Sequence, residues 1–463
     1  MRFWHPSRFL IACLLMGGLC ACALYHARPL PQQPDLHAGI QPLQVDAGQF
    51  HLPGLKPHPF DPAKGLDMTD VAILAVVNNP ALRSARAQAR AGEAQAFVAG
   101  LLPGPQLNYS LDHPTHQAPQ YVNAHSAGIA YDLTALLTHG AAKAAARASA
   151  RQVDLDLLWQ EWQVAQQARV LFVDCVTNER KLELLTRLRA GMQSDYAAER
   201  QAYAAGNLAL DGLALNLAAL QGVETRTANT ATTRNGACRS LNEVLGLQPA
   251  VSLKLVADDD ADAHAPALAA LDESLAQLPQ RRPDLLALQY GYRSQDELVW
   301  RAVLAQFPGI SFGITRAQDT SDVHTTGFNV SIGFPFLTGG SAAVHAAEAT
   351  RDALWNVYQQ RLDEAASEIK LIHADLGVLD SELAHARAAA PEAQQMLAGA
   401  RAAYARGDLT APAYYDLSIA ALNRQLGTLD LGAQRQQLQI ALETLLGLPP
   451  QDLLHPPVNE QSP

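Results

Sequence analysis

The cysteines near the start of this sequence have the types and spacing of a lipid-attachment site. The stretch "LCAC" (19–22) ends at Cys22, which has the small residue Ala21 directly before it, as in a bacterial lipobox. Cys20 fits this pattern less well because Leu19 occupies the small-residue position. We therefore expect Cys22 to carry acyl chains as the first residue of the mature chain. The alternative is a plain signal peptide with incidental cysteines.

Residues 1–21 have the plan of a secretory signal peptide, with Arg2 and Arg8 before an apolar run and small residues after it. This plan predicts export. Residues 22–62 are rich in proline and lack helical or strand periodicity, so we expect an extended tether. No later run of about 18 apolar residues occurs, and we expect no transmembrane helix in the mature chain.

Two further cysteines could form a disulfide in an oxidising compartment. Cys175 lies 31 residues before Gly206 and Cys238 lies 32 residues after it. If the chain turns back on itself at Gly206, the two cysteines stand at one height on neighbouring helices. Equal height does not ensure that the side chains face each other, so two buried thiols are the alternative. A Cα–Cα distance above about 7 Å would exclude the bridge.

Other chemistry finds little support in the sequence. Zinc-protease, nucleophile-elbow, phosphate-loop and paired-cysteine zinc patterns are absent, and we expect no enzyme, no cofactor and no metal site. His113 and His116 could bind a metal ion, but they lie in a proline-broken loop where solvated histidines are the simpler interpretation. The formal net charge of -11 argues against nucleic acid as a partner.

A long internal repeat organises the chain. "AYAAGNL" (202–208) returns as "AYARGDL" (403–409), which places Tyr203 against Tyr404 and Gly206 against Gly407, each 201 residues apart. "LNEVLGLQP" from residue 241 is likewise echoed by "LETLLGLPP" from residue 442. Self-similarity of this length indicates two copies of one structural unit.

Each copy contains two short segments in which apolar residues alternate with small polar ones. Four strands are therefore predicted, at about 105–112, 126–133, 309–316 and 327–336. The apolar faces include Ile129, Phe312 and Ile332. The opposite faces carry small residues: Asn108, Ser110, Gly128, Ser311, Gly313, Asn329 and Ser331.

These four strands favour a membrane barrel shared between chains. Two isolated hairpins over a soluble core are the alternative, but isolated hairpins are marginal in water. Lipid requires that all backbone groups pair within a closed sheet, and membrane barrels start at about eight strands. Four strands cannot close alone, so we expect an oligomer.

A very long helical segment follows each strand pair. Residues 120–248 contain no proline, and the helix expected up to Ala204 is far longer than an ordinary globular helix. Its second-copy partner has the three-and-four spacing of a coiled coil. The repeated glycines are then expected to turn two antiparallel helical hairpins. The expected hairpin ends comprise Tyr203, Gly206, Asn207, Leu208, Tyr404, Gly407, Asp408 and Leu409.

The sequence resembles the TolC-like outer-membrane efflux proteins, and within them the lipidated, NodT/OprM-type branch. The resemblance covers almost all of the mature chain and is most specific in "LPQRRPDLLALQYGYRSQDELVWRAVLAQFPGISF" (278–312). "AGLLPGPQL" (99–107) is similar to the phrase that metal-efflux members place before their first strand. The second strand departs from the family, because it ends in "AYDLTALLTHG".

The resemblance implies a mainly α fold with a small β part and two structural repeats. It implies a homotrimer with a 12-stranded barrel in outer-membrane lipid and a helical tunnel across the periplasm. Its hairpin ends would meet a periplasmic adaptor (membrane fusion) protein and an inner-membrane efflux pump. Three chains with four strands each agree with this barrel.

The resemblance also implies a constriction at the hairpin ends. The family places rings of aspartates six and nine residues after the second glycine. Here the first position is Ala413, with Gly212 in the other copy, so that ring is missing. The second position is Asp416, which matches. The alternative is that Asp416 only complements the helix dipole, and Asp211 and Asp408 could supply part of the lost charge.

We therefore expect a passive exit duct for small toxic compounds or metal ions in a tripartite efflux complex, anchored in the outer membrane by lipid. The alternatives are a lipid-anchored periplasmic adaptor or scaffold, and the exit duct of a type I protein secretion system. The expected divisions are a signal peptide (1–21), a tether (22–62), a first repeat (63–256), a linker (257–279), a second repeat (280–450) and a tail (451–463).

Overall fold

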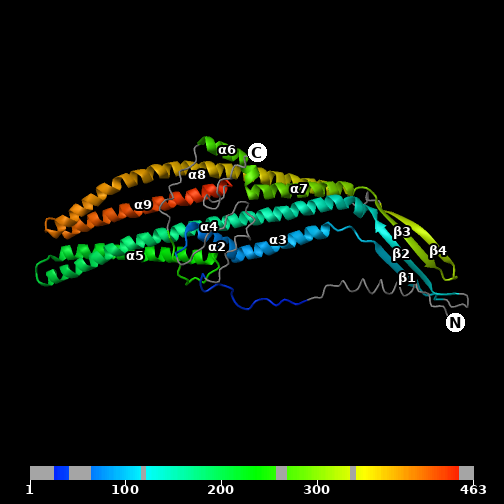
Figure 1. Cartoon of the computed structure of the whole chain (residues 1–463), viewed down its shortest axis with the longest axis horizontal. Coiled ribbons are helices and arrows are strands. Elements are labelled where there is room, and N and C mark those ends of the chain that lie inside the picture. Colours follow the sequence, from blue (N-terminus) through cyan, green and yellow to red (C-terminus); the bar gives the residue numbers. More distant parts are fainter. Residues whose placement is uncertain (1–25, 41–63, 116–120, 257–267, 334–339, 448–463) are drawn as a thin grey trace, which may run out of the picture. The chain divides into compact units, whose positions relative to one another are not determined.

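A computed structural model describes residues 26–40, 64–115, 121–256, 268–333 and 340–447 (Figure 1). The chain divides into two units, 1–36 and 37–463. In the first unit, the described residues 26–36 are exposed and contain no helix or strand. The second unit holds all the elements described below. Cys22, most of the expected tether and the expected tail lie outside the described residues.

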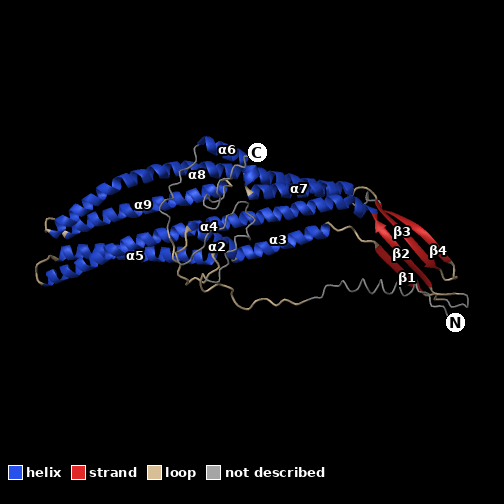
Figure 2. Cartoon of the chain, viewed as in Figure 1, coloured by secondary structure: helices blue, strands red, loops and turns tan. Residues whose placement is uncertain are grey.

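Helices make up most of the described chain, and four strands form a single sheet (Figure 2). The first repeat has the order α2 (Met68–Asn78), α3 (Pro80–Ala99), β1 (Gln106–Asp112), β2 (Ala124–Asp132), α4 (Leu133–Ala204) and α5 (Leu210–Val244). The second has α6 (Leu268–Arg281), α7 (Pro283–Leu304), β3 (Gly309–Gln318), β4 (His324–Gly333), α8 (Gly340–Ala405) and α9 (Ala411–Leu445). The predicted fold class, mainly α with two strand pairs, is confirmed.

The boundaries differ most from the sequence-based expectation in two places, and the other strand bounds differ by one or two residues. The expected linker, 257–279, is helical from Leu268 onward, because α6 buries Leu271 and Leu278 against α7 and α8. The sequence did not predict this helix, because its apolar stripe is short and lies in an alanine-rich, acidic segment. The last strand was expected over 327–336 but begins at His324, and residues 334–336 lie outside the described part.

The sheet is antiparallel, with the strands in the order β1-β2-β3-β4. Each repeat contributes one hairpin, and β2 joins β3 across the two repeats, with Ile129 opposite Ile314. β2 passes directly into α4, whose first turn is capped by Asp132, since its Oδ1 accepts hydrogen bonds from the backbone N–H of Thr134 and Ala135. At about 1.5 Å per residue, the 72 residues of α4 carry the chain roughly 110 Å from the sheet to its hairpin end (Figure 1).

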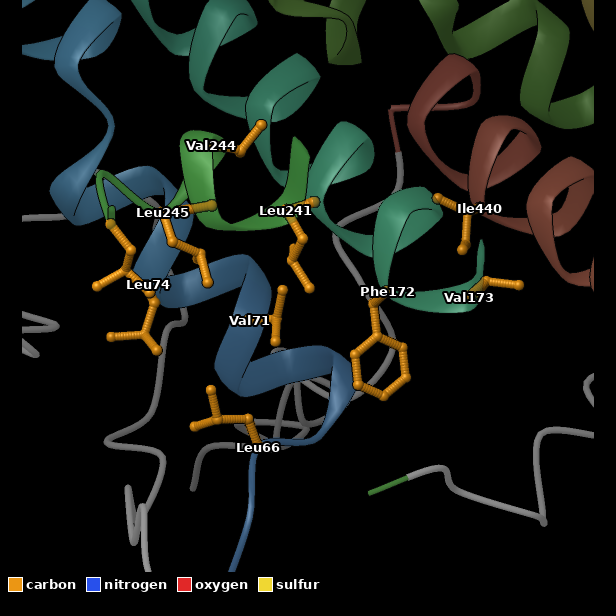
Figure 3. Close-up of a cluster of buried hydrophobic side chains, with 12 residues drawn as sticks. Leu66, Val71, Leu74, Phe172, Val173, Leu241, Val244, Leu245 and Ile440 are labelled. Carbon is orange, nitrogen blue, oxygen red and sulfur yellow. The ribbon is translucent and has the colours of Figure 1, made fainter. Parts of the chain in front are cut away.

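Four clusters of buried apolar residues pack the described helices together, and the two largest lie near the middles of α4 and α8. In the first, Val71 and Leu74 of α2 pack with Phe172 of α4 and Leu241 of α5 (Figure 3). The second joins α6, α7, α8 and α9 around Ile369. Fully burying a side chain of this size is worth about 1.5 to 3 kcal/mol. The α4 and α8 helices are therefore stabilised by packing near their middles. None of the helices described is long and apolar enough to cross a membrane.

In both repeats, the residue before the proline that starts a helix donates a hydrogen bond to the end of the returning helix. Asn79 precedes Pro80, and its Nδ2 donates to the carbonyl of Val244 at 3.0 Å. Arg282 precedes Pro283, and its guanidinium donates to the carbonyl of Leu445 at 3.3 Å. Each side chain thus ties the start of one helix to the end of the returning helix.

Candidate functional sites

The four-stranded sheet exposes one continuous apolar face. Leu107, Ile129, Ile314 and Phe328 form a row across all four strands, and each is at least half exposed. Phe312 and Val330 are paired in the next row, and their side chains also face outward. Bulky apolar side chains on the outside of a sheet are expensive in water, so this face requires an apolar environment.

The opposite face carries small and polar side chains. The rows Asn108–Gly128–Thr315 and Ser110–Ser126–Ala317 contain no bulky residue, and the two serine hydroxyls lie 2.9 Å apart. A Cβ atom at Gly128 would lie 2.9 Å from Thr315 Oγ1, so the close approach of β2 and β3 requires glycine there. The small residues that the sequence assigned to one face do share it, as the register shows.

The two outer strands leave hydrogen-bonding edges. Within the described residues, β1 pairs only with β2 and β4 pairs only with β3. An open edge of this kind invites pairing with another strand and is not found in contact with lipid. The sheet therefore has two separate requirements: an apolar environment for its exposed face and strand partners for its two edges.

The two hairpin ends have the same backbone structure. Gly206 has φ 75° and Gly407 has φ 78°, the left-handed region that favours glycine. In both ends the residue after the glycine donates its N–H to a carbonyl five residues earlier, Asn207 to Ala202 and Asp408 to Ala403, each at 2.9 Å. The glycines donate to the carbonyls of Tyr203 and Tyr404. These are Schellman motifs, which explains why the repeated phrase ends each long helix.

An aromatic cluster joins the second hairpin to the first near these ends. The rings of Tyr404 and Tyr414 stack with centroids 4.7 Å apart, and Tyr415 lies against both. The Tyr415 hydroxyl donates a hydrogen bond to Asp195 Oδ2 at 3.0 Å. Burial and the adjacent Asp195 carboxylate raise the pKa of Tyr415, so its hydroxyl stays a donor. Its two partners lie 220 residues apart, so no local pattern in the sequence predicts this contact.

A second acidic side chain lies one helical turn along α4 from Asp195. Burial raises the pKa of the Glu199 carboxyl, while a hydrogen bond from the Asn216 amide opposes that shift. Asn216 itself is buried between α4 and α5. The Asn216–Glu199 bond thus joins α5 to α4 within the first hairpin, whereas the Tyr415–Asp195 bond joins α9 to it.

Asp416 is exposed on α9, next to the buried Tyr415. The helix begins at Ala411, so Asp416 lies beyond the first turn, where a helix dipole has little effect. This position weakens the helix-dipole alternative. The other two acids are already engaged, because Asp408 accepts a 2.8 Å bond from Arg406 Nε and Asp211 accepts from the N–H of Gly212.

Cys175 and Cys238 form a disulfide between α4 and α5. Their Cα atoms are 5.1 Å apart, within the range that a bridge requires. Because Cys175 lies 31 residues before Gly206, the bridge is roughly 45 Å from the hairpin end. The equivalent positions of the second repeat are Leu376 and Gln439, so only the first hairpin is cross-linked in this way.

An ionic network around Arg282 is buried between the helices, and no pattern in the sequence predicted it. Arg282 is fully buried and binds Asp284 through two hydrogen bonds, of 3.0 and 2.6 Å. Asp284 also accepts from Arg361 of α8 at 2.8 Å, and the Arg282 guanidinium lies 4.9 Å from the centre of the Trp159 ring of α4. The sequence "RRPD" (281–284) contains Arg282 and Asp284, but only the fold shows that these two side chains are buried.

Comparison with known proteins gives a clear fold assignment. No family model matches the sequence. Outer membrane protein OprJ of Pseudomonas aeruginosa is 27% identical over 184 residues, which cover 37% of this chain and 38% of OprJ. The matched segment therefore spans well under half of that relative.

Solved structures match over nearly the whole chain. The outer membrane channel CmeC of Campylobacter jejuni is 15% identical with a TM-score of 0.72, covering 92% of this chain and 95% of CmeC. The outer-membrane channel OprN is 17% identical with a TM-score of 0.71, covering 91% and 98%. CusC is 19% identical with a TM-score of 0.70, covering 86% and 97%. Together with the four-stranded sheet and the paired long hairpins, these matches show that the chain has the TolC-like fold of outer-membrane channel structures.

Proposed function

We propose that this chain is one protomer of a trimeric outer-membrane channel, the passive exit duct of a tripartite efflux complex. The observation that carries this proposal is the sheet, which combines an exposed apolar face, a small polar face and two open edges. Three such sheets joined edge to edge close into a twelve-stranded barrel that is apolar outside and polar inside. The likeness to CmeC and OprN supports the proposal.

The helical hairpins then form the periplasmic part of the duct. Their ends, around Gly206 and Gly407, are the expected contact for a periplasmic adaptor protein and, through it, an inner-membrane pump. An adaptor or scaffold role for this chain is disfavoured because it explains neither the second hairpin nor the apolar sheet. An exit duct of type I protein secretion would use the same fold. Cross-linking from Asn207 and Asp408 in cells, with identification of the captured pump, separates these two duct functions.

The channel itself can be tested directly. Outer-membrane fractions should contain a heat-modifiable trimer, and the purified trimer should conduct in planar lipid bilayers. A monomer that fractionates with soluble periplasmic proteins would contradict the proposal.

Arginine on the apolar face of the sheet should be costly. Ile129→Arg, Phe312→Arg and Ile332→Arg should each lower the free energy of unfolding in lipid vesicles by roughly 2 to 4 kcal/mol, because the charge would face the bilayer. Ser331→Arg is the matched control, since Ser331 neighbours Ile332 but lies on the opposite face. Urea titration of the folded trimer measures the free energy of unfolding of the three variants and of the control. Equal tolerance of arginine on the two faces would argue against a lipid-facing sheet.

Asp416 should contribute to ion selection. Three Asp416 carboxylates around a threefold axis would repel one another and attract cations, which makes a narrow cation-selective constriction. Asp416→Ala should therefore reduce cation selectivity and raise the open-channel current in planar bilayers. Asp408→Ala is the control, because the Asp408 charge is paired with Arg406. If both variants conduct like the wild type, Asp416 is an ordinary surface residue.

The lipid anchor should be at Cys22. Mass spectrometry of the mature protein should find an amino-terminal acylated cysteine, and Cys22→Ala should abolish acylation. Cys20→Ala should leave acylation unchanged, because residues 1–21 are removed. An unmodified amino terminus, or one that begins elsewhere, would contradict this assignment.

A further inference from the structure

The apolar band on the strands is short for a membrane. On β3 the outward-facing apolar residues run from Ile310 to Ile314, and the next outward position is Arg316. At about 3.3 Å per residue this band covers only ~13 Å on β3, whereas membrane barrels carry an apolar band about 25 Å tall. On β1 the band is longer, because Tyr109 and Leu111 are exposed in the rows of Arg316 and His125. His125 and His324 occupy outward positions one row beyond Arg316. On β3 and β4, polar residues thus end the band at the end of the sheet far from the helices, so on these strands any extension lies on the helix side.

Uncharged sequence does extend in that direction. Residues 94–111, 133–142, 302–315 and 323–347 contain no Asp, Glu, Lys or Arg. Each stretch continues past the end of a strand toward the adjoining helix. On α4 the first charged residue is Lys143, so ten helical residues, or about 15 Å of helix, follow β2 without a formal charge. Added to the ~13 Å of apolar strand on β3, this length is enough for an apolar band about 25 Å tall.

Large apolar side chains are exposed in these stretches and directly beside them. We call the exposed apolar side chains of residues 97–102, 133–137 and 300–307 the junction collar. It includes Leu101 before β1, Leu137 after β2, and Trp300 and Phe307 before β3, all more than half exposed. A group of bulky apolar residues is unfavourable in contact with water, so we expect lipid or protein to cover this surface.

The collar is continuous with the apolar face of the sheet. Leu133 continues the outward alternation of Ile129 and Tyr131, and Leu136 and Leu137 share its helix face at spacings of three and four. The N–H of Ile310 donates to Thr134 Oγ1 at 2.8 Å, which fixes the first turn of α4 beside the start of β3. This continuity favours the same occupant on both surfaces.

We propose that the junction collar contacts the acyl chains of the periplasmic leaflet, so that the ends of α3 and α7 and the start of α4 lie within the bilayer. The inference rests on the proposed channel function and adds a lipid-binding surface that the strands do not provide. Trp300, next to the exposed Arg301, would mark the level of the headgroups, where tryptophan is favoured. A second copy of the chain covering the collar is the competing occupant.

Brominated lipid tests this directly, because bromine quenches tryptophan fluorescence only at close range. The mature chain contains Trp159, Trp162, Trp300 and Trp355. Trp300 is 54% exposed and Trp355, on α8 and outside the collar, is 55% exposed, which makes them a matched pair. The full-length trimer would be reconstituted into vesicles of ordinary or brominated phosphatidylcholine. The quenching caused by bromine should be lost for the most part in Trp300→Phe and retained in Trp355→Phe, with bromines near the headgroups more effective than deep ones.

A third variant separates this inference from the channel proposal. Ile129→Trp in the Trp300→Phe background places a probe on the sheet, and its emission should be quenched by deep bromines. If the sheet probe is quenched but Trp300→Phe loses no quenching, the sheet lies in lipid and the collar does not, which overturns the inference alone. If neither probe is quenched, both the inference and the membrane channel fail.

Discussion

Replacing Arg282 with methionine is expected to lower the free energy of unfolding by roughly 3 to 5 kcal/mol. Methionine keeps much of the apolar stem but leaves the carboxylate of Asp284 buried with Arg361 as its remaining cationic partner. It also removes the hydrogen bond to the Leu445 carbonyl and the cation–π contact with Trp159. Because these partners lie on α4, α8 and α9, the loss should loosen the meeting point of four helices. Denaturant unfolding of the purified protein measures the change.

Arg281→Met is the matched control for this experiment. Arg281 is the preceding residue and is exposed, so its replacement should change stability by less than about 0.5 kcal/mol. Similar losses in the two variants would show that the enclosed ionic network contributes nothing specific. The double variant Arg282→Met/Asp284→Leu should recover part of the loss, because it leaves no unpaired buried carboxylate in that pair.

The same network makes stability depend on pH. Burial acts to raise the pKa of Asp284, but the hydrogen bonds and charges of Arg282 and Arg361 outweigh burial and hold that pKa below its ordinary value of 3.8. The stabilisation is therefore fully present above pH 3.8 and is lost as the pH falls through the lower pKa of the folded state. Acid titration of Arg282→Met should show a smaller stability loss over that window than the wild type.

Removing the Cys175–Cys238 disulfide should cost about 4 kcal/mol, from the loop-closure entropy of its 63-residue separation. Cys175→Ser/Cys238→Ser should unfold at lower denaturant concentration than the wild type. Hydrogen exchange should locate the loss in α4 and α5, because the bridge joins only these helices. The second hairpin, with Leu376 and Gln439 at the equivalent positions, should keep its protection.

Reduction provides the control for the disulfide. A reductant should lower the stability of the wild type to that of the double serine variant and should leave the variant unchanged. If reductant has no effect on the wild type and thiol labelling finds two free cysteines, the bridge does not form in the mature protein. If thiol labelling finds no free cysteines and all forms are nevertheless equally stable, the bridge is present without constraining the unfolded chain.

Local patterns in the sequence determined most of the elements. Alternation over four to five residues placed the strands to within about three residues, because a strand with two unlike faces must alternate. The repeated Gly206 and Gly407 determined the ends of both hairpins, since a left-handed residue can close a helix almost without regard to its surroundings. The 201-residue repeat then predicted two copies of one unit.

Contacts between distant elements were decided only by the tertiary structure. Sequence spacing sets the height of a residue along a helix, so it placed Cys175 and Cys238 level, but the rotation of each helix depends on packing all along its length. The same limit hid the hydrogen bond between Tyr415 and Asp195 and the enclosure of Arg282. Exposure is also a property of the assembled fold: "FVAGLL" and "LTALL" look like ordinary core segments in the sequence, and only the structure leaves their apolar side chains uncovered beside the sheet.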